Sequence, residues 1–396
     1  MQSRIQLPLV SLIIISLLGT CMEIDISLPS FPSIMQFFDA TEAQVQSTLS
    51  LNFLAFCISG LFYGPLSESF GRRNLMVFGA SLFLIGAVGC ALSFSIHQLL
   101  LWRFVQGLGA SSTVVIGFTM ISDRYTGRVA ANYIGKINAY ITFFMAVAPI
   151  LGSIIINYST WRANFTFIAL TAFIAWIFMV FALPETKKER APLQLRTILQ
   201  DYWTVSRHRK FLLYATMPNM LVTAYLTFVG SASFYYINTC KLSYFQFAMQ
   251  QGLIVLLFSL TSFFANRLIK RIGGQSAVDL GMLLCGISIV FLTFFAFVYP
   301  YSSGLITFSM CWMAIGCAFP MSVTFAQSLE VLPNLKGTCS SFIMSTRLFL
   351  SSGAIALTGY FYDGSMRPVA LVIDVAIILG LIMYFLMPSQ SKYPRT

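Results

Sequence analysis

The chain has very little charge. Asp, Glu, Lys and Arg make up 9% of its 396 residues, whereas soluble domains carry roughly 25%. Hydrophobic residues make up 57%, and the mean hydropathy is +0.80. A water-facing surface cannot be built from this composition, so we expect an integral membrane protein.

Several patterns of reactive residues are also missing. There are two histidines, and the eight cysteines include no CxxC pair, which argues against a zinc site or a disulfide framework. We find no Ser/His/Asp or Cys/His set, metal cluster or phosphate loop, so we predict no enzyme, no cofactor and no metal. The chain has no segments of about ten residues in which apolar and polar residues alternate. This excludes an outer-membrane β-barrel, whose strands show that pattern. The net charge of +11 comes from short loops, so we predict no nucleic-acid partner.

Long apolar runs are what the chain does have. Twelve of them are long enough to cross a bilayer as helices. We predict spans at about residues 7–28, 45–66, 74–95, 98–120, 135–157, 165–183, 211–236, 245–266, 276–298, 303–326, 338–361 and 367–387. No small-x-small cleavage site follows the first run, so we expect it to stay in the mature protein as a helix.

Lys and Arg are strongly biased to one side of these spans. With the N-terminus inside, eighteen of the 24 fall in cytoplasmic segments and three fall outside. The positive-inside rule then places both termini in the cytoplasm, as in a multi-pass protein of the cytoplasmic membrane. The three outside are Arg162, Lys241 and Arg367, and the three within spans are Arg103, Lys136 and Arg347.

The longest polar stretch divides the spans six and six. We therefore predict an N-terminal half at 1–183, a cytoplasmic central loop at 184–210 and a C-terminal half at 211–396. The loop segment 193–206 could form an amphipathic surface helix. Basic, glycine-containing turns follow the second and eighth spans (64–77 and 266–274), which indicates two repeated halves with a substrate cavity between them.

Two carboxylates lie deep in the first span. A rise of about 1.5 Å per residue puts Glu23 roughly 24 Å along a helix from Leu7, inside a hydrocarbon layer of about 30 Å. Acids at such depth are expensive and mark functional sites. Positions two apart point about 200° apart, so Glu23 and Asp25 can hardly share one cavity unless the helix breaks, and Pro29 lies just beyond.

Three further stretches carry information. The turn 64–73 combines close-packing glycines, Glu68 and an arginine pair. The stretch 99–112 places Arg103 inside a span, followed by Gln106 and small residues. In 146–153, a proline and a glycine would kink the helix and allow tight contact between the halves.

These stretches resemble motifs of the major facilitator superfamily, and within it the twelve-helix drug/proton antiporters of the Bcr/CflA type. The turn resembles GxLxDRxGRR, with Glu68 replacing Asp and Ser69 replacing a basic residue; its matching residues are Gly64, Gly71, Arg72 and Arg73. LxxxRxxQGxGA is matched by Leu99, Arg103, Gln106, Gly107, Gly109 and Ala110. GPxxGG is matched at Pro149 and Gly152 but departs at Ala148 and Ser153, and DISLPSFPSI (25–34) is similar to DMYLPALPxI.

The resemblance implies an all-α major facilitator fold and proton-driven export of small organic molecules, with the proton gradient as the energy source. Asp25 matches the family acid and is our first choice for the group that carries the proton, with Arg103 as its fixed positive charge. Glu23 would be either a helper for cationic substrates or a solvated residue at the outer mouth. The turn 64–73 would act as a gating loop.

The substrate is the least determined property. Candidate cavity residues are Tyr140, Phe144, Asn219, Tyr225, Arg347 and Asp374. Arg347 and Asp374 start from opposite faces and could pair near the midplane, or Arg347 could bind an anionic substrate. We expect a monomer whose partners are protons, lipid and a small molecule. The alternatives are a dedicated transporter of one metabolite, such as a siderophore or amino-acid derivative, and a nontransporting receptor or assembly protein.

Overall fold

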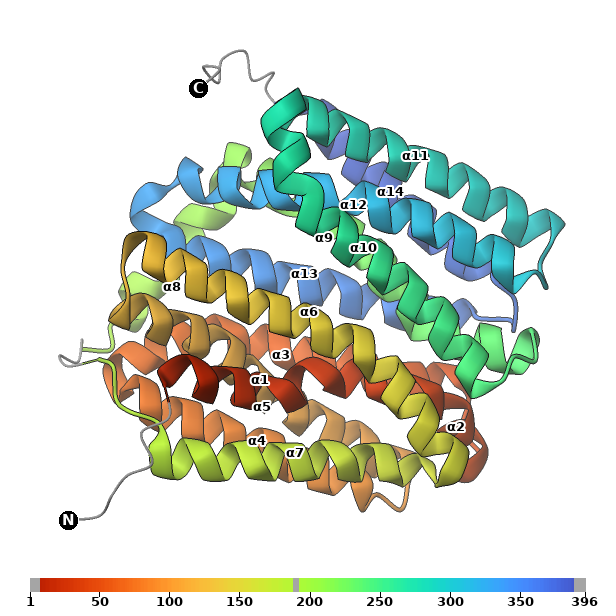
Figure 1. The fold of residues 1–396 in the computed structure, drawn as a ribbon, viewed down its shortest axis with the longest axis horizontal. Coiled ribbons are helices and arrows are strands. Elements are labelled where there is room, and N and C mark those ends of the chain that lie inside the picture. The colour runs from red at the N-terminus through yellow and green to blue at the C-terminus, as the bar shows by residue number, and fades with distance from the viewer. Residues whose placement is uncertain (1–7, 188–191, 388–396) are drawn as a thin grey trace.

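The structure is a computed structural model that describes residues 8–187 and 192–387, and the described part of the chain is helical throughout (Figure 1). The N-terminal elements are α1 Leu9–Ser27, η1 Leu28–Ser30, α2 Phe31–Phe38, α3 Glu42–Phe70, α4 Arg72–Ala91, α5 Ile96–Arg124, α6 Gly127–Tyr158 and α7 Trp161–Ala182. The later elements are α8 Leu195–Arg207, α9 Arg209–Ser233, η2 Phe234–Thr239, α10 Tyr244–Ile272, α11 Gly274–Val298, α12 Ser303–Val331, η3 Pro333–Leu335, α13 Lys336–Phe361 and α14 Arg367–Phe385.

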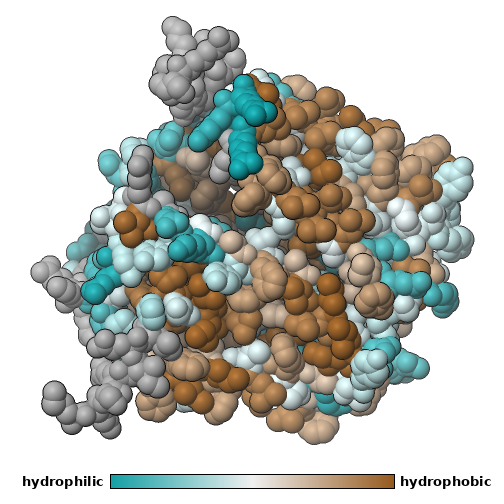
Figure 2. All heavy atoms as spheres, viewed as in Figure 1, coloured by the Kyte–Doolittle hydropathy of each residue, from teal (hydrophilic) through white to brown (hydrophobic). Residues whose placement is uncertain are grey.

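Twelve helical segments of the described residues are long and apolar enough to span a membrane, and each overlaps one predicted span. The prediction of twelve spans is therefore confirmed. The first differs most from its predicted bounds, because the helix continues through η1 and α2 and the whole segment runs over Leu9–Phe38. Figure 2 shows apolar side chains gathered in a broad middle belt with polar ones toward both ends, as a bilayer requires.

The helices form two bundles, α1–α7 and α9–α14, which lie side by side in Figure 1. The short helix α8 lies in the connection between them, so the expected helix at 193–206 is confirmed. We call the end of the bundle that holds α8, Gly71 and Gly273 the central-loop end. The opposite end, which holds Asp39 and Lys241, is the far end.

The halves repeat each other in local detail. At the far end, α3 and α10 each begin with a capping box, formed by Thr41 with Gln44 and by Ser243 with Gln246. At the central-loop end, the same two helices end at glycines with positive φ, 94° at Gly71 and 89° at Gly273. Non-glycine residues rarely adopt this conformation, so both turns depend on glycine.

The two halves are in direct contact at the far end. Ser33 and Tyr244 are joined by a hydrogen bond of 3.2 Å, and the rings of Phe31 and Phe234 lie 6.0 Å apart. In Figure 1, α6 and α10 converge toward this end and diverge toward the central-loop end. There a cavity of about 450 Å³ lies between the halves, with walls from α3, α5, α8 and the start of α13. The interface is therefore in contact at the far end and hollowed at the central-loop end.

Candidate functional site

An ion pair is buried in the N-terminal half, where α1 and α5 cross. Nη1 of Arg103 lies 3.5 Å from Oε2 of Glu23, and the two side chains are 0% and 1% exposed. Arg103 is among the largest fully buried side chains described. Removing two opposite charges from water costs free energy that their mutual attraction only partly returns. A fully buried pair is therefore a candidate for a functional role.

Neighbouring polar side chains satisfy only part of this pair. Gln106, one turn along α5, accepts a hydrogen bond of 2.9 Å from Nη1 of Arg103. Asn52 on α3 donates to the backbone oxygen of Arg103 at 3.1 Å and to Glu23 at 3.5 Å. Nε and Nη2 of Arg103 make no hydrogen bond with a described residue, although the guanidinium carbon lies 5.6 Å from the centroid of the Phe165 ring. The cluster is therefore under-satisfied, and unpaired buried donors are costly in the arrangement observed.

The expected pairing of Arg103 with Asp25 was wrong. Glu23 takes that place, and it is not a solvated residue at the mouth, because its side chain is 1% exposed. Positions two apart on a helix point about 200° apart, so the side chain of Asp25 points away from Arg103. The charge of Asp25 instead acts on the hydroxyl of Tyr225 on α9, in the C-terminal half. Asp25 is 4% exposed and makes no hydrogen bond or ion pair with another described residue.

Asn52 is the site residue that the sequence reading missed. Its signal was a polar amide in the middle of an otherwise apolar span. Asn164 is a second buried amide of this kind: it donates to Ser30 at 2.7 Å and to the backbone of Gly152 at 3.2 Å, and so holds the break between α1 and α2.

Arg347 and Asp374 do not meet. Nε of Arg347 donates to Oδ1 of Asn219 at 3.1 Å, whereas Asp374 accepts a hydrogen bond from Thr293 on α11. The alternative in which the two pair near the midplane was therefore wrong. Asn219 also donates to the backbone oxygen of Ile343 at 2.9 Å, so its amide fixes α9 against α13.

The expected aromatic cavity residues lie apart. Tyr225 lines a cavity in the C-terminal half. Tyr140 is exposed on α6 with Phe144 beside it, their ring centroids 6.2 Å apart, and neither belongs to that cavity or to the one at the central-loop end.

The predicted packing residues bring backbones into contact. A Cβ atom on Gly107 would lie 2.2 Å from the backbone oxygen of Asn52 on α3, and one on Gly109 would lie 2.2 Å from the backbone nitrogen of Phe83 on α4. Gly152 meets Ile26 of α1 in the same way, at 2.3 Å. Tight contact at Pro149 and Gly152 was expected between the halves; Gly152 instead makes it within the N-terminal half.

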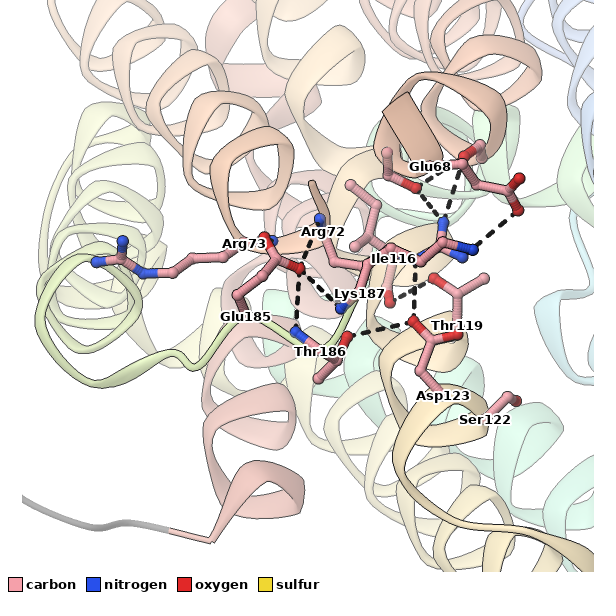
Figure 3. A network of polar contacts seen from close by, with 12 residues as sticks. Glu68, Arg72, Arg73, Ile116, Thr119, Ser122, Asp123, Glu185, Thr186 and Lys187 are labelled. Carbon is pink, nitrogen blue, oxygen red and sulfur yellow. Dashed lines mark hydrogen bonds and ion pairs between the residues drawn. The ribbon is translucent and has the colours of Figure 1, made fainter. Parts of the chain in front are cut away.

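The turn after α3 forms a charged network at the central-loop end (Figure 3). Nε of Arg72 lies 3.0 Å from Oδ2 of Asp123 at the end of α5, and its Nη1 donates to Ser67. Glu68 lies on the other side of the guanidinium at 3.5 Å. Glu185, beyond α7, accepts from the backbone N–H groups of Arg72 and Arg73 at 3.0 and 3.2 Å and so caps α4. The network ties four helix ends of one half together.

Replacing Arg72 by alanine is expected to lower the free energy of unfolding by about 2–3 kcal/mol, because the side chain is buried and Asp123 loses its partner. Arg73→Ala is the control: its side chain donates one hydrogen bond, to the backbone of Val180 at 2.6 Å, and about 1 kcal/mol should be lost. Thermal unfolding of the purified variants in detergent measures both. Equal losses would contradict the central role of Arg72.

The sequence was compared with protein families and with solved structures. A family model described as "Major Facilitator Superfamily" matches residues 13–356. The chain belongs to this superfamily. Major facilitator proteins with resistance functions are among its relatives. It is 25% identical to a bicyclomycin resistance protein homolog of Haemophilus influenzae over 94% of each chain, which confirms the resemblance to the Bcr/CflA type. It is 26% identical to a chloramphenicol resistance protein of Pseudomonas aeruginosa, over 85% of this chain and 80% of the relative.

Solved structures share the major facilitator fold. A bacterial homolog of the human lysosomal transporter Spinster, in an inward-facing and unoccupied conformation, superposes with a TM-score of 0.78 at 14% identity, covering 96% of this chain and 97% of that one. A D-xylose–proton symporter gives 0.75 at 14% identity, covering 96% and 98%. Together with the superfamily match and the relatives, this makes the chain a multi-pass membrane transporter and not an enzyme.

Proposed function

We propose that this transporter exports drug-like or other small organic molecules from the cytoplasm in exchange for protons, by alternating access. The observation that carries the proposal is the fully buried Glu23–Arg103 pair in the N-terminal half. A carboxylate that is neutralised by an arginine in one state can take up a proton in a state where the two are apart. The unfilled donors of Arg103 support such a rearrangement.

Asp25 is the second buried acid of α1, and unlike Glu23 it has no ion-pair partner among the described residues. No cation or hydrogen-bond donor of the described residues occupies its oxygens, so they stay available for a proton or a cationic ligand. Its charge also acts on the hydroxyl of Tyr225 in the C-terminal half, so a change in its protonation is felt across the interface. In this proposal the two acids have different roles: Asp25 takes up and releases the proton, and the Glu23–Arg103 pair rearranges within the N-terminal half in response.

The direction follows from the charge bias. Lys and Arg concentrate at the central-loop end, so we assign this end to the cytoplasmic side of a bacterial inner membrane. With the far end closed and the central-loop end open, the conformation is then inward-facing, ready to load substrate from inside. The transmembrane proton gradient supplies the energy, and no cofactor takes part.

Proton coupling is tested by measuring proton release when a substrate is added to the purified protein in detergent. We expect Asp25→Asn to abolish the release and to lower proton-driven transport in liposomes at least about tenfold, the loss typical of removing a group that transfers protons. Asp279→Asn is the matched control, since Asp279 is exposed and binds Gln275 and Tyr384 near the start of α11. Full release from Asp25→Asn would remove Asp25 from the mechanism.

The breadth of the substrate range is tested in cells with and without the gene. A broad change in tolerance to unrelated lipophilic compounds supports multidrug export, as the printed names of the relatives suggest. Loss of one released compound would instead identify a dedicated transporter of that metabolite, such as a siderophore or amino-acid derivative. Asp25→Asn serves as the inactive reference in both arms.

A further inference from the structure

A second cavity, of about 150 Å³, lies inside the C-terminal half. Its walls come from α9, α10, α12 and α13 and are almost wholly apolar; Ile254, Phe258, Met313 and Ala314 are typical members. Two polar side chains reach it, Tyr225 and Arg347. The cavity therefore combines an apolar body with a cationic group at its wall.

The guanidinium of Arg347 is only partly used by the protein. Nε donates to Asn219 at 3.1 Å, and Nη1 contacts the sulfur of Met344 at 3.8 Å. Nη2 makes no hydrogen bond with a described residue. An arginine presents five N–H donors in a planar fork, and that fork matches a carboxylate with two parallel hydrogen bonds. The hydrogen bond from Nε to Asn219 fixes the orientation of the guanidinium plane.

No carboxylate of the described residues lies within 4.0 Å of Arg347 to neutralise it. Asp374, the acid expected to do so, is bound to Thr293, and Asp279 is bound to Gln275 and Tyr384. Arginine stays charged in proteins, so Arg347 carries a positive charge without an ion-pair partner among the described residues, near the middle of α13. Charges at such positions mark substrate or ion pathways.

We propose that this cavity binds the carboxylate form of a small organic acid, with the carboxylate on Arg347 and a ring-sized apolar body among the side chains of α9, α10 and α12. An apolar cavity of about 150 Å³ in another protein holds benzene, so one aromatic ring fits the volume. The inference rests on the proposed function, because it names the class of substrate that the exporter carries. It places substrate recognition in the C-terminal half, and the proton-handling acids Glu23 and Asp25 in the N-terminal half.

The test is the binding of 4-phenylbutyrate to the purified full chain in nanodiscs of neutral phosphatidylcholine, which offer no anionic lipid as a competitor. Isothermal titration calorimetry compares this acid with its uncharged amide, which has the same shape. We expect the acid to bind about 10- to 100-fold more tightly than the amide, the usual worth of a charge-assisted hydrogen bond. Arg347→Gln should erase this difference, and Arg347→Lys should restore part of it.

Two variants guard against a folding artefact. Arg267→Gln removes the same charge outside the cavity, from the cytoplasm-proximal part of α10, and should leave binding unchanged. Ala314→Leu keeps Arg347 but fills the cavity, and should weaken the binding of acid and amide alike. Equal binding of acid and amide by the wild type, or an undiminished preference in Arg347→Gln, would overturn the proposal.

Binding is measured without a proton gradient, so this result is separate from the proposed function. Proton-driven export of lipophilic cations together with no preference for the acid would overturn the carboxylate site alone. Arg347-dependent binding of the acid in a protein that moves no solute in liposomes would overturn the export function and leave the site standing.

Discussion

Glu23→Gln is expected to lower the free energy of unfolding by about 3–5 kcal/mol, although the substitution changes almost nothing in shape. The loss arises because Arg103, which is 0% exposed, would keep its charge without a counter-charge. Its remaining partner, Gln106, offers one neutral oxygen at 2.9 Å. Thermal and denaturant unfolding of the purified protein in detergent measure the change.

The chain offers a matched control for this substitution. Glu68 lies 3.5 Å from Arg72, the same distance that separates Glu23 from Arg103, but the Glu68 side chain is 49% exposed. Exposed pairs are worth about 0–1 kcal/mol, so Glu68→Gln should change the stability by less than that. Equal effects of the two substitutions would show that burial does not govern the energy of the Glu23–Arg103 pair.

A double variant tests the pair itself. In Glu23→Gln/Arg103→Gln both charges are gone, so the double variant should lose about 1–3 kcal/mol less stability than the sum of the two single variants, and this difference is the coupling free energy of the pair. Transport should not return, because the group that responds to the proton is missing. Additive losses in the double variant would mean that the two charges do not interact.

The fold could be predicted from the sequence because its determinants are local. The length and apolar content of each run set the spans, and the positions of Lys and Arg set their orientation. Glycines at Gly71 and Gly273 indicated equivalent turns in the two halves, and both turn out to have positive φ. These properties need no knowledge of which helix contacts which.

The pairing of side chains could not be predicted, because it depends on how each helix is rotated about its axis. The sequence established that Glu23 and Asp25 point apart, but it could not say which of them faces α5. The similarity of residues 25–34 to the family motif DMYLPALPxI favoured Asp25. The packing of α1 against α5 instead turns Glu23 inward and Asp25 toward α9.

The uncompensated charge of Arg347 was hidden for the same reason. The sequence shows how far Arg347 lies along α13 and Asp374 along α14. It does not show that the side chain of Asp374 faces Thr293 on α11 and not Arg347. The closed far end also depends on contacts between distant segments, such as Ser33 with Tyr244. Hydropathy carries no information about such contacts.

Gly109→Ala is expected to destabilise the protein by about 3 kcal/mol, the upper end of what overpacking costs. The added Cβ would lie 2.2 Å from the backbone nitrogen of Phe83 and 2.5 Å from the backbone oxygen of Gly79. Neither atom can move away as the end of a flexible side chain could. The helices α4 and α5 would have to separate, and the shift would reach Arg103 two turns earlier on α5.

Gly286→Ala is the control with the opposite sign. A Cβ on Gly286, in the interior of α11, meets nothing within 4 Å, so the higher helix propensity of alanine should stabilise the protein by up to about 1 kcal/mol. Gly107→Ala, whose Cβ would lie 2.2 Å from the backbone of Asn52, should repeat the loss on the other side of α5. Thermal unfolding compares all three. If Gly109→Ala proved as harmless as Gly286→Ala, the close backbone contact between α4 and α5 would be absent from the protein.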